Sequence, residues 1–170
     1  MEQIRKFKKI TWEDLPDYGL YSDQVVDFID EKLISFFPET LSLSPSMINN
    51  YVKNKIIPKP VKKKYYREHL GHLMVVIVLK QTIAINRIKD GINLQKKIMD
   101  TEEGFNEFMD ILENSYNNIL NCLEGSDPIV YKGFEATRDN ISLTLAINAF
   151  CFQTLTNYIL NKGGIYNDKS

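Results

Sequence analysis

The sequence predicts an all-α protein, and three observations support this prediction. Apolar residues recur three and four positions apart through most of the 170 residues, which is the spacing of an amphipathic helix. Eight glycines and six prolines are few for an all-β fold with its many turns. Hydrophobic residues make up 44% and charged residues 25% of the chain, so it can bury a core of its own and is neither fibrous nor disordered.

Two helices are predicted in the first third of the chain. Residues 22–36 carry apolar side chains at helical spacing with acidic ones between them, up to a stop at Pro38. Ser44 then begins a short helix as its N-cap, and Pro45 takes the first helical position, where its missing N–H costs nothing. We expect this short helix to end near Asn54.

Two prolines shape the segment that follows. Pro58 and Pro60 cannot continue a helix, so residues 56–66 are predicted to be extended. The next helix is predicted over about residues 67–80. Its run 73–79 is apolar on every side and must lie at the centre of the core.

The second half of the chain is predicted to be helical as well. Another helix starts near Ile83, with a break near residues 81–82 or 91–93. Asp100, followed by an acidic residue three positions later, marks the start of a helix of more than five turns. The last helix covers about residues 135–161, and its uncharged stretch is expected in the core or at a dimer interface.

Crossing a membrane is the alternative for that last helix. Asn148, Gln153 and Asn157 interrupt it and no basic residues flank it, so we expect no membrane span. Cys122 and Cys151 form no disulfide pattern, and the chain starts with no apolar leader. Both features are typical of a cytoplasmic protein.

Charge is distributed unevenly along the chain, although the formal net charge is only −1. Residues 1–40 sum to −4, residues 41–100 to +9 and residues 101–170 to −6. Seven Lys and Arg lie between Lys53 and Arg67, with no acidic residue among them. Such a run is either a solvated lysine-rich loop or a surface that binds a polyanion.

Motifs of enzymes are missing from the sequence. It has no phosphate-binding loop, dinucleotide fingerprint, nucleophile elbow or Cys-x-x-Cys pair. His69 and His72 are three residues apart on one predicted helix, but only Glu68 is near enough in sequence to complete a metal site with them. We therefore predict no enzyme, no metal site and no cofactor, with His72 beside the core and His69 on the exposed side of the helix.

The short helix and the basic segment after it together suggest a DNA reader. A recognition helix needs short polar side chains that reach base edges, and an amide can pair with adenine while lysine reads guanine. The helix over residues 45–54 has such an outer face, and lysines on the extended segment can contact phosphates. The predicted DNA-binding residues are Ser46, Asn49, Asn50, Lys53, Lys59, Lys62, Lys63, Lys64 and Arg67.

The same residues carry a resemblance to a known family. The stretch from Met47 to Pro58 resembles the recognition helix and wing entry of MerR-type winged helix-turn-helix regulators. The positions that match are Ile48, Tyr51, Ile56, Ile57 and Pro58. The resemblance implies a winged helix-turn-helix with a small β wing over residues 1–95, followed by a helical dimerisation or effector module over residues 96–170.

The sequence departs from that family at the end of the short helix and in the turn before it. Lys55 stands where the family has a glycine, and we expect Asn54 to adopt the left-handed conformation instead. Asn49 replaces an arginine, and the connection over residues 37–44 is longer than the family's tight turn.

The whole chain also resembles an uncharacterised bacterial family known as a domain of unknown function, numbered 1836. Its M-I-N-N-Y-V-K and K-K-Y-Y-R-E-H-L stretches are part of that resemblance. The family name implies no activity, but it implies that residues 101–170 belong to the same unit as the rest.

The leading functional hypothesis is a cytoplasmic transcriptional regulator that binds double-stranded DNA. It would act as a homodimer, because a two-fold dimer doubles the contacts of a small reader, and it could respond to a small-molecule effector. The alternative is a helical protein–protein interaction module that keeps the winged-helix shape, does not bind DNA and uses its basic segment on an acidic partner.

Overall fold

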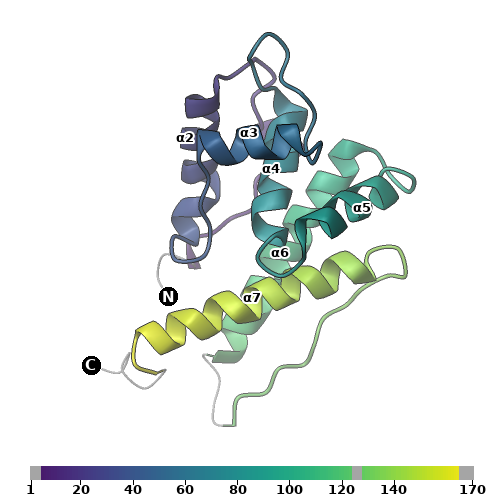
Figure 1. Ribbon diagram of the computed structural model, residues 1–170. Coiled ribbons are helices and arrows are strands. Elements are labelled where there is room, and N and C mark those ends of the chain that lie inside the picture. Colours follow the sequence, from purple (N-terminus) through teal and green to yellow (C-terminus); the bar gives the residue numbers. More distant parts are fainter. Residues whose placement is uncertain (1–4, 124–127, 165–170) are drawn as a thin grey trace.

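The structure is a computed structural model and describes residues 5–123 and 128–164 (Figure 1). The all-α prediction is confirmed, because the described residues form helices and no strand. The elements are η1 (Trp12–Asp14), α2 (Ser22–Lys32), η2 (Ile34–Phe36), α3 (Pro45–Lys53), α4 (Arg67–Leu79), α5 (Ile85–Gln95), α6 (Thr101–Leu123) and α7 (Ile141–Asn161).

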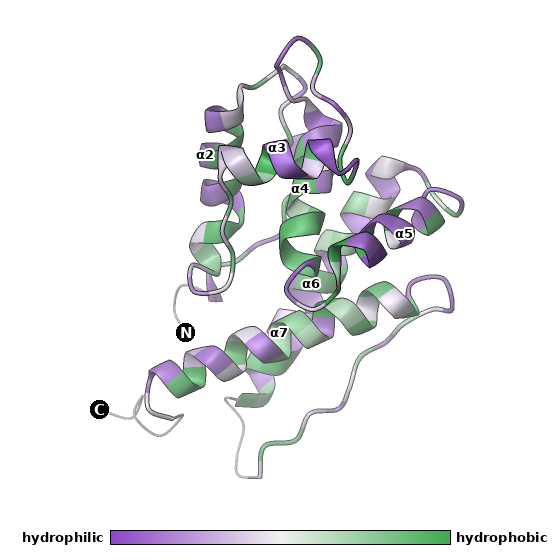
Figure 2. Cartoon of the chain, viewed as in Figure 1, coloured by the Kyte–Doolittle hydropathy of each residue, from purple (hydrophilic) through white to green (hydrophobic). Residues whose placement is uncertain are grey.

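Helix α4 lies at the centre of the molecule and the other helices surround it (Figure 1). Its apolar run is buried as predicted, and Figure 2 shows it as a hydrophobic column between more polar neighbours. Helices α2 and α3 pack at one end of α4, and α6 and α7 pack together at the other. The hydrophobic core is continuous from Phe7 to Leu155, so it crosses the expected boundary at residue 95.

The predicted helix over residues 22–36 is too long. Helix α2 ends at Lys32, because Leu33 has a φ of −140° and turns the chain into the short η2. This turn buries Leu33, Ile34 and Phe37, which would also share one face of a straight helix. Apolar spacing alone could not distinguish these two solutions.

The predictions for α3 and α6 are confirmed at their N-termini. The Oγ of Ser44 accepts a hydrogen bond of 3.3 Å from the N–H of Met47, and Pro45 is the first helical residue. The carboxylate of Asp100 accepts one of 2.9 Å from the N–H of Glu103. Both helices begin where a side chain satisfies a free N–H of the first turn.

The last helix begins later than predicted. Helix α7 starts at Ile141, and residues 128–136 have no regular secondary structure. Thr137 and Asn140 exchange hydrogen bonds, in which the Asn140 Oδ1 accepts from the Thr137 N–H at 2.8 Å and the Thr137 Oγ1 accepts from the Asn140 N–H at 3.3 Å. This local turn competes with the helix for backbone partners.

Helix α7 is long and apolar enough to cross a membrane, but 44% of its most apolar window is buried inside the protein. A helix of a protein core meets the same criteria of length and composition, so this feature indicates little about a membrane. The break before α5 lies at residues 80–84, as one of the two alternatives predicted, and Gly91 lies within α5.

The small β wing is not formed as a pair of strands in the described part of the chain. The segment contains two isolated bridges instead, one between Val61 and Lys64 and one between Leu20 and Tyr65. The next hydrogen-bonded pair of such a ladder would join Lys59 and Tyr66, but the Lys59 carbonyl and the Tyr66 N–H bond to the ring of His69 instead. On the other side of the segment, Tyr65 exchanges its backbone hydrogen bonds with Leu20.

Candidate nucleic-acid interface

Helix α3 places the predicted polar residues on its outer face. Asn49, Asn50 and Lys53 are exposed, as is Ser46, while Ile48 is fully buried on the opposite face. The amides of Asn49 and Asn50 make no hydrogen bond to any part of the protein that the structure describes. Both are therefore free to bind an external partner, and each can donate and accept at once.

Tyr51 fixes the orientation of α3. Its ring is 7% exposed, and the Nζ of Lys80 on α4 lies 5.9 Å from the ring centroid. Burial raises the pKa of the Tyr51 hydroxyl and lowers the pKa of the Lys80 ammonium. The burial of the ring and its contact with Lys80, the C-cap of α4, hold the outer face of α3 in a fixed position relative to the core.

The end of α3 is a Schellman motif with a lysine where glycine is usual. Lys55 has a φ of +55°, and the Ile56 N–H donates to the Tyr51 carbonyl at 2.9 Å. Asn54 has a φ of −83°, so the prediction that Asn54 takes the left-handed conformation is wrong. In a Schellman motif the left-handed residue is the second one after the last helical residue, and in this protein that residue is Lys55.

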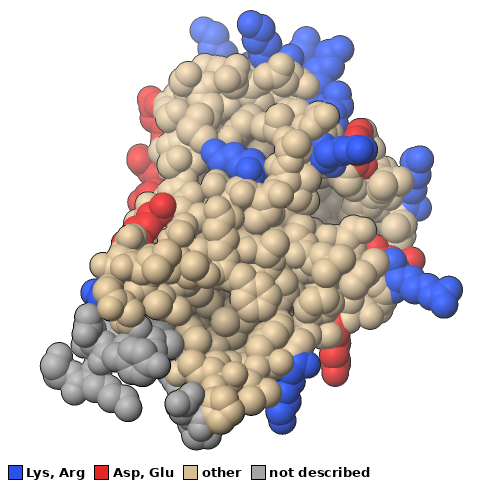
Figure 3. Space-filling model, turned by 60° about the horizontal axis from the view of Figure 1, so that its bottom comes forward, with Lys and Arg blue, Asp and Glu red and all other residues tan. Residues whose placement is uncertain are grey.

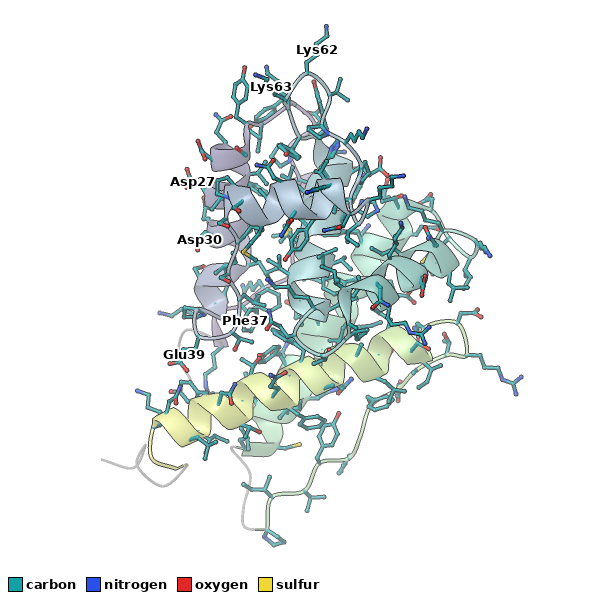
Figure 4. All side chains as sticks on the ribbon, viewed as in Figure 1. Asp27, Asp30, Phe37, Glu39, Lys62 and Lys63 are labelled. Carbon is teal, nitrogen blue, oxygen red and sulfur yellow. The ribbon has the colours of Figure 1, made fainter. Side chains whose placement is uncertain are left out.

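The basic arm, defined as residues 55–66, ends in a two-residue hairpin turn. Val61 and Lys64 exchange backbone hydrogen bonds of 3.0 and 2.9 Å, with Lys62 and Lys63 between them. Their φ values are +49° and +66°, which defines a type I′ turn, normally made by Asn and Gly. Figure 4 shows both lysines at the tip, pointing away from the protein.

Two of the predicted DNA-binding residues also hold the arm and α4 against the N-terminal segment. The Nζ of Lys64 lies 5.4 Å from the ring centroid of Tyr21, and Lys64 is half-buried. The Nε of Arg67 donates to the Leu15 carbonyl at 2.9 Å, and its Nη1 lies 3.5 Å from Glu13. Lys59, Lys62 and Lys63 are exposed, so they are the arm residues most available to a ligand.

His69 is a residue of this site that the sequence analysis did not include among the DNA-binding residues. It is 5% exposed, contrary to the prediction of an exposed position. Its Nδ1 accepts from the Tyr66 N–H at 3.0 Å, so its Nε2 carries the proton and donates to the Lys59 carbonyl at 3.0 Å. One ring thereby joins Lys59 and Tyr66, which lie on the two sides of the hairpin. Only the fold could reveal a contact between residues 59 and 69, which Pro60 and the turn separate in the chain.

His72 lies beside the core, as predicted. Its Nδ1 donates to the Glu68 carbonyl at 2.6 Å, and burial lowers the pKa of the imidazole. No group of three or more metal-ligating side chains occurs near it or elsewhere in the described residues.

We expect the stability of the protein to depend on pH through His72. The unfolded chain binds a proton near the ordinary value of 6.5, whereas the folded protein binds it only at lower pH. The contribution of His72 to the free energy of unfolding should therefore be constant above about pH 6.5 and should fall as the pH drops below that value. Urea titrations between pH 7.5 and about pH 5 would measure this slope, which His72→Gln should reduce. An unchanged slope in the variant would contradict the assignment.

Charge is separated over the surface. Lys and Arg gather at the end of the molecule that carries the arm, at the top of Figure 3, and Asp and Glu line the edge formed by α2. Asp27 and Asp30 point outward from that helix in Figure 4. A polyanion would be attracted to the arm and repelled from α2, which limits the direction from which it can approach α3.

Comparisons with known proteins give one result. No curated protein and no solved structure matches the chain. A family model described as "Domain of unknown function (DUF1836)" matches residues 10–119, which include α3, the arm and most of α6. That match covers more than half of the chain, and we conclude that the protein belongs to this family.

Proposed function

We propose that the protein is a DNA-binding transcriptional regulator of the MerR-like winged helix-turn-helix kind. In this proposal α3 enters the major groove, where Asn49, Asn50 and Lys53 contact base edges and Ser46 lies at the helix start. The lysines of the arm contact phosphates beside the groove. The hairpin at the tip of the arm takes the place of a wing built from longer strands.

The hairpin tip is the observation that supports this proposal most strongly. A left-handed backbone costs a non-glycine residue about 1 to 2 kcal/mol, and the tip has two such residues in succession. Asn and Gly would form the same turn without that strain. Strained residues cluster at functional sites, so lysine at both positions is best explained by a need for two charges.

A homodimer with a small-molecule effector completes the proposal. Leu145, Phe152 and Leu160 are 53%, 41% and 70% exposed on α7, and this apolar face favours pairing with a second subunit. We place the regulator in the cytoplasm, in keeping with its two free cysteines.

The protein–protein interaction module remains the second candidate, and the exposed carboxylates of α2 favour it. Four of them form an acidic edge that DNA would avoid and a basic partner would bind: Asp23, Asp27, Asp30 and Glu31. This candidate predicts no affinity for random DNA.

The proposal is tested first by fluorescence anisotropy of the full chain with random-sequence duplex DNA at several salt concentrations. We expect the logarithm of the binding constant to fall linearly with the logarithm of salt, by about 0.9 for each phosphate contacted. A folded protein that does not bind at low salt would exclude the DNA-binding function and leave the interaction module.

We further expect Asn49→Ala with Asn50→Ala to relax the sequence preference. Each amide that pairs with a base contributes about 1 to 3 kcal/mol of discrimination, whereas phosphate contacts contribute none. The affinity of the variant for duplexes that the wild type selects from a random pool should fall by at least about tenfold. Its affinity for unselected DNA should not change.

The chain offers a matched control for this variant. Asn117 and Asn118 are an adjacent, exposed pair on α6, far along the chain from the arm. Changing both to alanine should leave selected and unselected binding as they are. Equal effects of the two variants would contradict base contacts by α3.

A further inference from the structure

Two neighbouring cavities lie beneath α5, and the smaller one borders the interface described above at Lys55 and Lys59. The larger has a volume of about 380 Å³ and lies between α4, α5, α6 and the start of α7. The smaller, of about 310 Å³, lies between α4, α5 and the root of the arm. His72, Ile92 and Lys96 line both, so the cavities share a wall.

The larger cavity is apolar over most of its surface. Val75, Leu79, Phe108 and Leu143 are among the side chains that line it. It exists because α5 covers α4 and α6 incompletely, since only Ile88 of this helix is buried. A cavity of about 150 Å³ with similar walls holds one benzene ring, so this one has room for a body of roughly two rings or an equivalent alkyl chain.

The smaller cavity is cationic. Four lysines line it and no carboxylate does. Lys55, Lys59 and Lys89 form no ion pair with any described residue, and Lys96 lies 3.4 Å from Glu68 in a pair that is about half exposed. The larger cavity, by contrast, includes two carboxylates, Asp100 and Asp139, in its lining. A negative group is therefore favoured on the smaller side of the shared wall.

From this arrangement we infer that the two cavities form a binding site for a small amphiphilic anion. Its apolar body occupies the larger cavity, and its carboxylate or similar head lies beside Lys96 and Lys89 at the smaller one. Only an amphiphilic anion complements both cavities. A neutral apolar ligand would make no ion pair with the lysines, and a fully polar anion would leave the apolar walls of the larger cavity in contact with water. This inference specifies the effector of the proposed function, but its test requires no DNA.

Isothermal titration calorimetry of the full chain with three probes tests the inference. Decanoate, decan-1-ol and decyltrimethylammonium have the same tail with a negative, a neutral and a positive head. The two ions are used below their micelle concentrations, and the alcohol below its solubility limit. We expect decanoate to bind at least about tenfold more tightly than decan-1-ol, and the cation to bind most weakly. Absence of binding, or equal binding of all three, would overturn the inference.

Variants locate the head and the tail of the ligand. Lys89→Gln with Lys96→Gln should reduce the affinity for decanoate to that for decan-1-ol, because it removes the two charges proposed to lie beside the head. Lys96 is exposed and Lys89 is half-buried, and glutamine keeps most of the length of each side chain. A control with the same loss of charge, Lys62→Gln with Lys63→Gln, should leave decanoate binding unchanged. If the control lowers the affinity as much as the α5 variant, the head does not lie at the smaller cavity.

Gly91→Phe tests the position of the tail. Gly91 lines the larger cavity, and a Cβ there would meet no heavy atom within 4 Å, so a side chain can start at this position without a clash and the helix gains propensity. We expect decanoate and decan-1-ol both to bind at least tenfold more weakly. Unchanged binding of both would place the ligand elsewhere. The cavity variants leave the basic arm intact. If the three probes do not bind, the proposed ligand site is therefore excluded while the proposed DNA-binding function still stands.

Discussion

Changing Lys59, Lys62 and Lys63 to glutamine is expected to weaken binding to random duplex DNA on the order of a thousandfold at about 0.05 M salt. Each of these exposed lysines is proposed to replace one phosphate counterion, which contributes about 0.9 to the slope of log affinity against log salt. Loss of all three should make the slope shallower by about 3. Anisotropy titrations of the variant and the wild type measure both quantities.

Lys64 is omitted from this variant because its side chain packs over Tyr21. Replacing Lys64 would remove this contact with Tyr21 as well as the charge. A matched control changes three exposed lysines outside the arm, Lys8, Lys97 and Lys132, to glutamine. If this control weakens binding as much as the arm variant, the effect is one of net charge and not of the arm.

Lys62→Asn with Lys63→Gly separates binding from folding more sharply. Asn and Gly accept the left-handed backbone of the type I′ turn, so the protein should become more stable by about 1 to 2 kcal/mol. The same change removes two proposed phosphate contacts and should weaken DNA binding. A variant that is more stable and binds DNA as well as the wild type would contradict a role for these charges.

Phe37→Ala is expected to lower the free energy of unfolding by about 3 to 5 kcal/mol. Phe37 is 1% exposed, and its ring centroid lies 5.2 Å from that of Phe7, 4.8 Å from Tyr116 and 5.7 Å from Phe150. It thus connects the N-terminal segment to both α6 and α7. Truncation leaves a cavity among aromatic rings that cannot move together without losing other contacts.

Urea unfolding followed by two probes checks this prediction. Trp12, the only tryptophan, packs on Phe105 at 5.8 Å and reports on η1 and α6, while circular dichroism reports on all helices. Both transitions should shift together, because one core connects the two halves. Phe36→Ala is the control, and it should lower the free energy of unfolding by less than Phe37→Ala does, because Phe36 is only partly buried. Separate transitions in the two probes would show that the halves unfold independently.

Local chemistry allowed some of this structure to be predicted from the sequence. The start of α3 required only Ser44 and Pro45, which act within one turn, and the apolar run of α4 could only be a central helix. The outer face of α3 followed from the same helical spacing. Each of these features depends on residues that are close together in the chain.

Features that depend on distant contacts could not be predicted in this way. The turn at Leu33 is favoured by the pocket that Phe37 fills against α6 and α7. The exchange of hydrogen bonds between Tyr65 and Leu20 takes the place of a wing ladder. The role of Arg67 depends on the position of Leu15, which lies 52 residues away. Nothing in the neighbouring sequence encodes these partners.

The ring of His69 has a mechanical consequence for the arm. Because it binds the carbonyl of Lys59 and the N–H of Tyr66, it closes residues 59–66 into a loop without a covalent bond. The two ends stay together as long as both hydrogen bonds are intact, so the tip should swing as one unit on a fixed base rather than unravel. The charges on Lys62 and Lys63 are thus presented at a constant height above α3.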